Sequence, residues 1–352
     1  MTVNRDAIVG CLLGMAVGDS LGLPYEGLSP ARASRLLGRP DRHRLLFGHG
    51  MVSDDTEHAI MVAQALCVAS GCSDRFAREL ARRLRVWLLG LPAGVGRATL
   101  RAVVRLWLGF GPDRAGVYSA GNGPSMRAPV LGAAVDDLAI LIDFVRASTL
   151  VTHRDPKALY GAIAVAVATR TAWVARSDPT AFLVELTQVL PPEANEFLRM
   201  VHAVVASARC GTETPQFAKE LGLDKGVSGY TYHSVPVCLH AWLRYQGDFA
   251  SSVEAVIRCG GDSDTTAAVV GGIVGAGTTK AGIPSKWLDG IADWPLSLPF
   301  LEKLGEALYN SLQGRPASRD VSRFPVLTRL PRNLLFLTIV LYHGFRRLLP
   351  PY

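Results

Sequence analysis

The sequence predicts an all-α protein, and three observations support this prediction. Apolar residues recur with the period of a helix through most of the chain, whereas the strict alternation of a half-buried strand is scarce. The connections between the periodic segments are rich in Gly, Pro and Asp, which end helices and form turns. No internal repeat of about 20–50 residues is present, which argues against a solenoid.

Each periodic run between two such connections predicts one helix. The expected helices in chain order are Arg5–Gly18, Thr56–Ser70, Arg75–Leu89, Ala98–Leu108, Val130–Val145, Lys157–Ala175, Pro179–Val189, Ala194–Ala208, Val235–Tyr245, Phe249–Cys259, Thr265–Ala276 and Phe300–Leu312.

Glycines form a pattern in the first and one of the last of these helices. They recur at every fourth position from Gly10 to Gly22, which places them on one side of the helix, and Gly271 and Gly275 repeat the spacing. Glycine costs a helix about 1 kcal/mol relative to alanine. We therefore expect these rows to allow close approach of neighbouring backbones; chance placement is the alternative in a chain with 35 glycines.

The composition excludes several classes of protein. Of the 352 residues, 49% are hydrophobic and 19% are charged, which excludes a disordered or fibrous chain. The glycines have no triplet period, which excludes collagen. The length allows two domains or one large core, and the low charge and high apolar content favour one large helical core.

The net charge of +7 comes almost entirely from arginine, since only six of the 37 basic residues are lysines. Nucleic-acid binding would need basic residues gathered on one face with aromatic residues between them. The densest cluster, Arg78–Arg85, has an amphipathic helical pattern and is expected to form a solvated face. Nucleic acid is therefore not the expected partner, whereas an anionic small ligand is compatible with the charge.

Cysteines, the N-terminus and the apolar runs predict a soluble cytoplasmic protein without a transmembrane segment. The six cysteines lie scattered in apolar stretches without CxxC spacing, so we expect mostly buried thiols and no zinc site. The first residues, MTVNRD, lack the basic-then-apolar pattern of a signal peptide. The strongest apolar run, Leu334–Tyr342, is far shorter than the ~20 residues of a membrane span.

Two acidic clusters stand directly before expected helices. They are SDDT at residues 53–56 and GGDSDTT at residues 260–266. Such residues can cap the free backbone N–H groups of a helix, but capping needs one residue rather than a run of oxygen ligands. Carboxylates beside hydroxyls suit a hard cation such as Mg²⁺ or Mn²⁺, and two clusters that meet could bind two ions. From these residues alone, capping and metal binding both remain open.

Six segments, in order along the chain, resemble the ADP-ribosylglycohydrolase family. Together they cover roughly residues 7–277 and make a specific match, where one motif alone would be weak. The resemblance implies a compact, multi-helix single domain with a binuclear magnesium or manganese cleft. The matching segments are Gly10–Gly27, Ser53–Ala59, Gly121–Arg127, Val151–Pro156, Gly226–Pro236 and Gly260–Ala276.

The resemblance also implies a set of metal ligands for two Mg²⁺ or Mn²⁺ ions. They are Ser53, Asp54, Asp55, Asp262, Asp264 and Thr265. Serine stands at residue 53 where the family commonly has threonine, and it keeps the hydroxyl oxygen. Glu26 matches an acidic residue on a mobile loop near the metals, although an ordinary surface glutamate is the alternative.

A second set of residues is implied to bind the substrate. Glycines in a loop let backbone N–H groups approach phosphate oxygens closely, which suits the segment at residues 121–126. His153 matches a residue that lines the same cleft, with a structural histidine as the alternative, and Tyr230 matches a segment near the adenosine. The implied substrate-binding residues are Gly121, Asn122, Gly123, Ser125, Met126, His153 and Tyr230.

The implied reaction is metal-dependent hydrolysis of the bond between C1″ of ADP-ribose and an acceptor. The expected partner is an ADP-ribosylated protein, with arginine as the preferred acceptor by analogy only. Asp262 or Asp55 would act as the base on water, and Glu26 would assist the reaction or gate entry. The sequence does not choose among these carboxylates, between the two metals, or among arginine-, serine-, nucleic-acid- and small-molecule-linked conjugates.

Two alternatives belong to other functional classes. The DSDTT run at residues 262–266 fits the motif of a haloacid dehalogenase-type phosphatase, but that motif should follow a strand near the start of an α/β domain. A non-catalytic ADP-ribose binder or structural protein on the same scaffold is the second alternative. The retained acidic residues of both clusters argue against it.

The end of the chain lies beyond the resemblance. We expect a catalytic domain over residues 1–314 and an extension over residues 315–352 that contains a helix. This helix is expected to dock on the core, and a partner- or membrane-binding segment is the alternative. The sequence carries no signature of the oligomeric state.

Overall fold

The computed structural model describes residues 3–315 and 326–347, and no strand occurs within these ranges. The prediction of an all-α fold is therefore confirmed. The alternative of a haloacid dehalogenase-type phosphatase is wrong, because Asp262 follows two glycines in a loop and precedes a helix rather than following a strand.

Short loops connect the helices. Their bounds are α1 Arg5–Gly22, α2 Pro30–Leu37, α3 Asp54–Ala69, α4 Ser73–Leu89, α5 Arg97–Trp107, α6 Pro112–Ala115, α7 Gly123–Ala134, α8 Leu138–Leu150, α9 Pro156–Val174, α10 Pro179–Val189, α11 Asn195–Arg209, α12 Thr214–Glu220, α13 Thr231–Arg244, α14 Phe249–Ile257, α15 Ser263–Thr278, α16 Ser285–Asp289, α17 Leu298–Leu312 and α19 Val326–Arg346.

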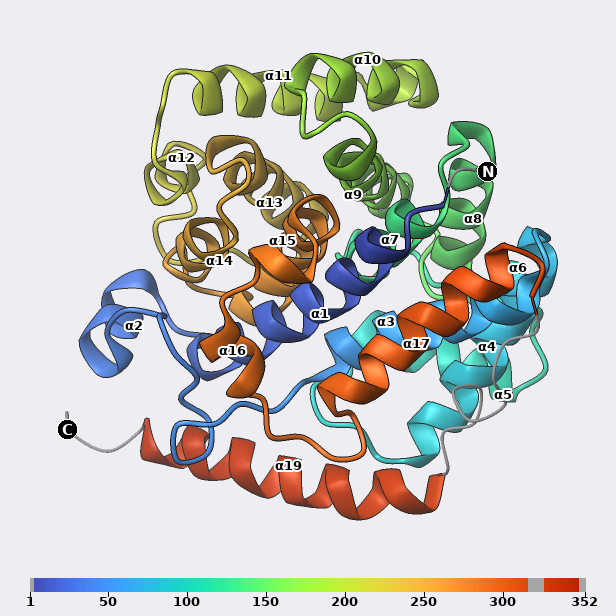
Figure 1. Cartoon of the computed structure of the whole chain (residues 1–352), viewed down its shortest axis with the longest axis horizontal. Coiled ribbons are helices and arrows are strands. Elements are labelled where there is room, and N and C mark those ends of the chain that lie inside the picture. Colours follow the sequence, from blue (N-terminus) through green and yellow to red (C-terminus); the bar gives the residue numbers. More distant parts are fainter. Residues whose placement is uncertain (1–2, 316–325, 348–352) are drawn as a thin grey trace.

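Helices α1 and α15 form the centre of the molecule, where they run side by side (Figure 1). A Cβ atom on Gly14 would lie 2.1 Å from the carbonyl oxygen of Gly271, and one on Gly18 would lie 2.0 Å from that of Ala267. Gly10 meets Gly275 in the same way. The glycine rows therefore allow backbone-to-backbone contact, as predicted, and the two rows face each other.

The other helices pack around this central pair. Helix α14 packs on α15, α17 packs on α1, and α7 contacts both central helices as well as α9 (Figure 1). One cluster of buried apolar residues extends through these layers, with Trp87 and Trp242 among its largest fully buried side chains. The described residues thus share one main core, in accord with the composition.

One predicted helix is wrong. The expected helix Val130–Val145 is two helices, α7 and α8, separated at residues 135–137. The break has a local cause, because the side chain of Asp137 accepts a hydrogen bond from the backbone N–H of Ile140 and so caps α8. The short helices α2, α6, α12 and α16 were not predicted, since none is long enough to show a clear period.

The longest strongly apolar helix is α1, which the short apolar runs of the sequence do not single out. Within the described ranges, one helix is long and apolar enough to cross a membrane, Arg5–Tyr25, with a mean hydropathy of 1.6. Its apolar window is entirely buried inside the protein, as in the central helix of a core. All six cysteines are free; three are buried, whereas Cys72 and Cys210 are exposed, contrary to the expectation that most are buried.

Helix α19 crosses one edge of the molecule, and its inner side contacts several segments of the core (Figure 1). Phe336 and Ile339 join a small buried cluster with Leu23, Leu45 and Met51. The expected extension over residues 315–352 includes residues 316–325 and 348–352, which lie outside the described residues. The domain boundary at residue 314 stays a prediction.

The contact between α1 and α15 predicts a large effect of one added methyl group. Gly18→Ala should lower the free energy of unfolding by roughly 3 kcal/mol, because the new Cβ would meet a backbone carbonyl that cannot turn away. Gly344→Ala in α19 is the matched control, since nothing lies within 4 Å of its added Cβ. Urea unfolding of both variants measures the difference, and equal midpoints would contradict the close contact.

Candidate functional site

The N-termini of four helices meet at one cavity of about 390 Å³. Its lining includes Ser53, Gly96, Asn122 and Asp262, the residues that directly precede α3, α5, α7 and α15. The first N–H groups of a helix have no partner within the helix, and the helix dipole makes this end positive. The cavity is therefore suited to an anionic ligand.

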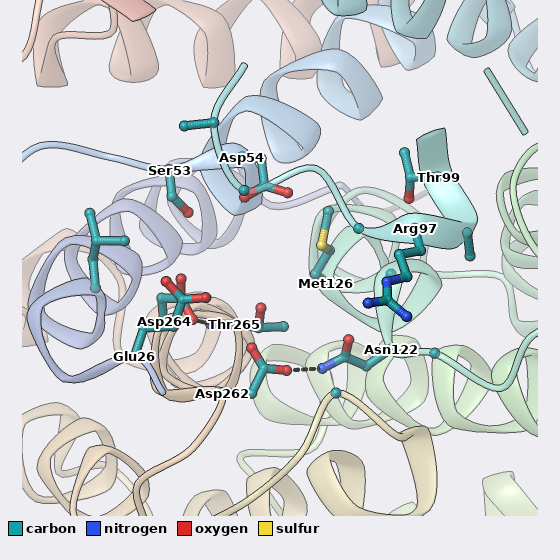
Figure 2. A pocket seen from close by; sticks show the side chains of 18 of the residues that line it. Glu26, Ser53, Asp54, Arg97, Thr99, Asn122, Met126, Asp262, Asp264 and Thr265 are labelled. Carbon is teal, nitrogen blue, oxygen red and sulfur yellow. Dashed lines mark hydrogen bonds between the residues drawn. The ribbon is translucent and has the colours of Figure 1, made fainter. Parts of the chain in front are cut away.

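The first acidic cluster forms the start of α3. The side chain of Ser53 accepts a hydrogen bond from the N–H of Asp55, so capping explains one residue of this cluster. Buried Asp19 of α1 fixes the same turn, because its Oδ2 accepts hydrogen bonds from the N–H groups of Ser53, at 2.8 Å, and Thr56, at 3.2 Å. Asp54 lines the cavity from this turn (Figure 2).

The second acidic cluster forms the start of α15. Gly260 and Gly261 have φ of +67° and +79°, a left-handed turn that favours glycine, and they bring Asp262 to the helix start. Asp262 makes no capping hydrogen bond with its own side chain. Its Oδ2 instead accepts a 2.7 Å hydrogen bond from Nδ2 of Asn122 (Figure 2). Capping therefore does not explain Asp262.

The two clusters are in direct contact. The hydroxyl of Thr265 in α15 donates a 3.1 Å hydrogen bond to Oδ2 of Asp55 in α3. Glu26, Asp262 and Asp264 lie together on one side of the cavity, with Asp54 across from them (Figure 2). The two clusters thus meet although Asp55 and Thr265 are 210 positions apart in the chain. We call the carboxylates gathered here the acidic wall: Glu26, Asp54, Asp55, Asp262 and Asp264.

Burial and mutual repulsion shape the electrostatics of this wall. Burial raises the pKa of Asp262 and raises the pKa of Asp54, Asp55 and Asp264 well above the usual range, and the charges of neighbouring carboxylates add to the shift of these three. Desolvation and the charge of Asp262 raise the pKa of Glu26 as well. Ionisation of all these carboxyl groups therefore carries a high free-energy cost unless positive charge is added nearby.

The donor set fits a hard divalent cation. A cation favours the ionised carboxylates that burial and repulsion oppose, and Oδ1 of Asp55 is buried without a hydrogen-bond partner among the described residues. Among residues 3–315 and 326–347, no group of three His, Cys, Asp or Glu side chains is arranged as a set of metal ligands. Oxygen donors from the two clusters that line the cavity are Ser53, Asp54, Asp262, Asp264 and Thr265.

The loop before α7 lines the other half of the cavity. A Cβ on Gly123 would lie 2.9 Å from Cε1 of His153, and one on Gly121 would lie 3.2 Å from its Nε2, so both glycines let the loop pack on this ring. Burial, with a contribution from the charge of Arg127, lowers the pKa of His153 to about 3, and the ring is therefore neutral. Met126 also lines this half.

Three predicted site residues do not line the cavity. Asp55 lies behind Thr265, and Ser125 is buried in α7 with no hydrogen-bond partner for its Oγ among the described residues. The hydroxyl of Tyr230 accepts a 3.1 Å hydrogen bond from Nζ of Lys157, and the neighbouring Gly229 lines the cavity instead. The roles predicted for these three residues stay predictions.

Sequence reasoning missed several residues of the site. Asp19 has a signal, since it lies within the glycine row, directly after Gly18, in a segment that the resemblance already covers. Arg97 points its guanidinium toward Asn122 (Figure 2), and the preceding Gly94 and Gly96, which also line the cavity, could have marked it as a loop for an anion. Phe336 of α19 had no signal, because its position in the site depends on where a distant helix packs.

Helix α19 also holds the chain on both sides of the acidic wall. Arg332 donates hydrogen bonds to buried Asp293, with Nη2 to Oδ2 at 2.6 Å, and to the carbonyl oxygen of Val52. Asp293 in turn accepts from the N–H of Val52, so both backbone groups directly before Ser53 are fixed. Farther along, Arg347 donates to the carbonyl oxygen of Glu26.

Comparisons with known proteins agree with this geometry. The sequence model of the ADP-ribosylglycohydrolase family matches residues 1–318. An uncharacterised protein of Archaeoglobus fulgidus is 31% identical, over 85% of this chain and 94% of its own length. The ADP-ribosyl-[dinitrogen reductase] glycohydrolase of Rhodospirillum rubrum is 28% identical, over 81% of this chain and 90% of its own length.

Two further similarities extend to animals and to a solved structure. The human ADP-ribosylhydrolase ARH3 is 24% identical, over 79% of this chain and 87% of its own length. A solved "ADP-ribosylglycohydrolase-related protein complex" contains a chain with a TM-score of 0.63 and 26% identity, which covers 89% of this chain and all of that one.

The clamp from α19 predicts a loss of stability when its arginine is removed. Arg332→Met should lower the free energy of unfolding by about 3 kcal/mol or more, because Asp293 is left buried without its cation. Adding Asp293→Asn should recover part of this loss. Arg78→Met, at an exposed position of α4, is the control. Chemical denaturation measures all three, and an unchanged Arg332→Met protein would contradict the clamp.

Proposed function

Because this chain belongs to the ADP-ribosylglycohydrolase family, it is a glycosidase that acts on ADP-ribosyl conjugates, and we propose that it releases ADP-ribose from modified protein side chains, with arginine as the preferred acceptor. One observation carries the proposal. The acidic wall and the glycine-rich loop before α7 line the same cavity, so that a charged sugar conjugate can reach both. The name of the Rhodospirillum relative, which gives dinitrogen reductase as the modified protein, supports a protein substrate.

The two halves of the cavity suit the two ends of the ligand. The N-termini of α5 and α7 offer free N–H groups to the diphosphate, and Arg97 adds a positive charge beside them. The distal ribose would then extend toward the acidic wall. Its hydroxyl groups can donate hydrogen bonds to the carboxylates, and the His153 ring, which is neutral, would pack beneath the loop without adding a charge.

We propose that the acidic wall holds two Mg²⁺ or Mn²⁺ ions. The oxygen ligands would come from the starts of α3 and α15, namely Ser53, Asp54 and Asp55 with Asp262, Asp264 and Thr265. When bound, the ions supply Lewis acidity and fix the orientation of the ribose hydroxyls. The raised pKa values of these carboxylates support the proposal, since a dense group of buried acids needs positive charge to ionise.

Hydrolysis breaks the bond between C1″ and the acceptor nitrogen or oxygen and joins C1″ to the oxygen of water. The base removes one proton from this water, and the leaving group receives one. Asp262 is the favoured base, because it lines the cavity and its hydrogen bond with Asn122 holds one oxygen in place. Asp55 is less accessible, since it lies behind Thr265. Glu26 lines the cavity and has a raised pKa. It would donate the proton that the leaving group receives.

A non-catalytic ADP-ribose binder is the remaining alternative. A binder would need the loop before α7 but not the acidic residues of the wall. Glu26, Asp54, Asp262 and Asp264 all line the cavity, which favours a hydrolase. The two readings differ in product, because a binder retains the conjugate whereas a hydrolase releases free ADP-ribose.

The proposed reaction predicts selective loss of activity in one variant. Asp54→Asn should reduce kcat/KM for release of ADP-ribose from an ADP-ribosyl-arginine protein by about 100-fold or more, because it removes an acidic group from the cavity. Asp143→Asn, an exposed carboxylate of α8, should leave the activity unchanged. Serine-linked and nucleic-acid-linked conjugates assayed in parallel test the acceptor preference. Binding of the conjugate without release would favour the binder.

The proposed ions predict a stability change that does not depend on activity. Mg²⁺ or Mn²⁺ at about 100 times its Kd should stabilise the chelator-treated protein by about 2.7 kcal/mol for each ion bound, measured as a rise in Tm. Asp264→Asn should raise the Tm of the metal-free protein, since it removes a repelling charge, and should reduce the response to metal. Asp143→Asn should keep the full response. If neither metal changes the Tm of the wild-type protein, the proposal of bound ions is contradicted.

A further inference from the structure

The polarity of α19 is the reverse of that of an ordinary surface helix. Its inner side carries Arg329, Arg332 and Asn333, which are only 5%, 5% and 1% exposed. Its outer side carries large apolar residues that face solvent with exposures from 37% to 68%. We call these residues the outer face: Leu330, Leu334, Leu337, Leu341, Tyr342 and Phe345.

The outer face is continuous. Its residues recur every three or four positions, which aligns them along one side of a helix of 21 residues, about 30 Å long. The exposed positions between Leu330 and Phe345 are all uncharged, and α19 contains no Asp or Glu. Helix α19 lies along an edge of the molecule, where a flat partner can reach it (Figure 1). Exposed apolar surface of this extent marks an interaction site.

A second apolar group lies beside the C-terminal half of α19. Leu46 and His49 pair through their backbones in a tight turn, and Phe47 at the tip of this turn is 97% exposed. Phe47 and Tyr342 both line a groove of about 820 Å³ between the turn and α19. The exposed aromatic ring thus lies next to the outer face although it comes from a distant part of the chain.

The groove beside the outer face is strongly basic. Arg42, Arg44, Arg346 and Arg347 line it, together with apolar side chains of the turn and of α19. A helix that combines a wide apolar face with nearby cations and lies in the plane of a membrane interface has this composition. Lipid phosphates and carboxylates complement the arginines, and acyl chains complement the leucines.

We propose that the outer face of α19, together with Phe47 and the basic groove, is a docking surface for an anionic lipid bilayer. The helix lies on the bilayer rather than across it, since Arg5–Tyr25 is the one described helix that is long and apolar enough to span a membrane, and it is buried. A second copy of the chain that docked through the same surface would offer it no opposite charge, because neither the lining of the groove nor α19 includes an Asp or Glu. Charge complementarity therefore favours lipid over a second copy of the chain.

Flotation of the full-length protein with vesicles tests the proposal. Wild-type protein should bind vesicles of phosphatidylcholine that contain phosphatidylserine, and should bind vesicles of phosphatidylcholine alone at least about tenfold more weakly, with a further loss at high salt. The double variant Leu341→Ser with Phe345→Ser should bind the anionic vesicles at least about tenfold more weakly than wild type. Arg42→Glu with Arg346→Glu should also weaken binding about tenfold and should reduce the dependence on salt.

A matched control separates docking from a general change in surface polarity. Val174→Ser with Val184→Ser replaces two exposed apolar residues outside α19 and should bind vesicles as wild type does. Since all four replaced apolar side chains face solvent, the Tm of both double variants should stay close to that of wild type, which confirms folding. Absence of wild-type binding, equal binding by the outer-face variant, or a wild-type dimer in light scattering that this variant converts to a monomer would overturn the proposal.

Discussion

Cβ atoms on Gly14 and Gly18 would lie only 2.1 and 2.0 Å from the carbonyl oxygens of Gly271 and Ala267, so α1 and α15 touch backbone to backbone. The pairs run in opposite directions along the two helices, and the last of them joins Gly22 to Ser263. This register sets the start of α15 against the end of α1. The loop that carries Glu26 follows directly, and Asp262 and Asp264 lie beside it. The acidic wall therefore depends on a packing contact that contains no charged group.

In the site that the central helices position, two electrostatic effects act against each other. Helix N-termini from four directions favour negative charge in the cavity. Burial disfavours negative charge, and it raises the pKa of Asp19 to about 6 even though this carboxylate accepts several hydrogen bonds. Hydrogen bonds from Thr265 and Asn122 orient the acids but supply no net charge. The carboxylates are thus held in place at a cost in stability, as expected of groups kept for function rather than for folding.

Local chemistry explains how much of this could be predicted. The glycine rows and the acidic clusters act within one or two turns, so spacing alone located them, whereas the roles of the site residues came from the resemblance to the family. Eleven of the predicted site residues line the cavity: Glu26, Ser53, Asp54, Gly121, Asn122, Gly123, Met126, His153, Asp262, Asp264 and Thr265. Tyr230 was harder, because a backbone at the site does not fix where its side chain points. The break between α7 and α8 went unseen because apolar residues continue across the capping Asp137.

In helix α19, the polarity of a residue does not predict whether its side chain is buried. An amphipathic pattern identifies two sides of a helix, and hydrophobicity normally assigns the apolar side to the core. Here the inner side is polar because Arg332 and Asn333 satisfy backbone and carboxylate groups near Val52 and Gly90, which apolar side chains could not do. Only Phe336 and Ile339 are needed to fill the small cluster below. The helix can therefore dock firmly while its larger apolar side stays in solvent, and the match of the family sequence model ends at residue 318, before α19 begins.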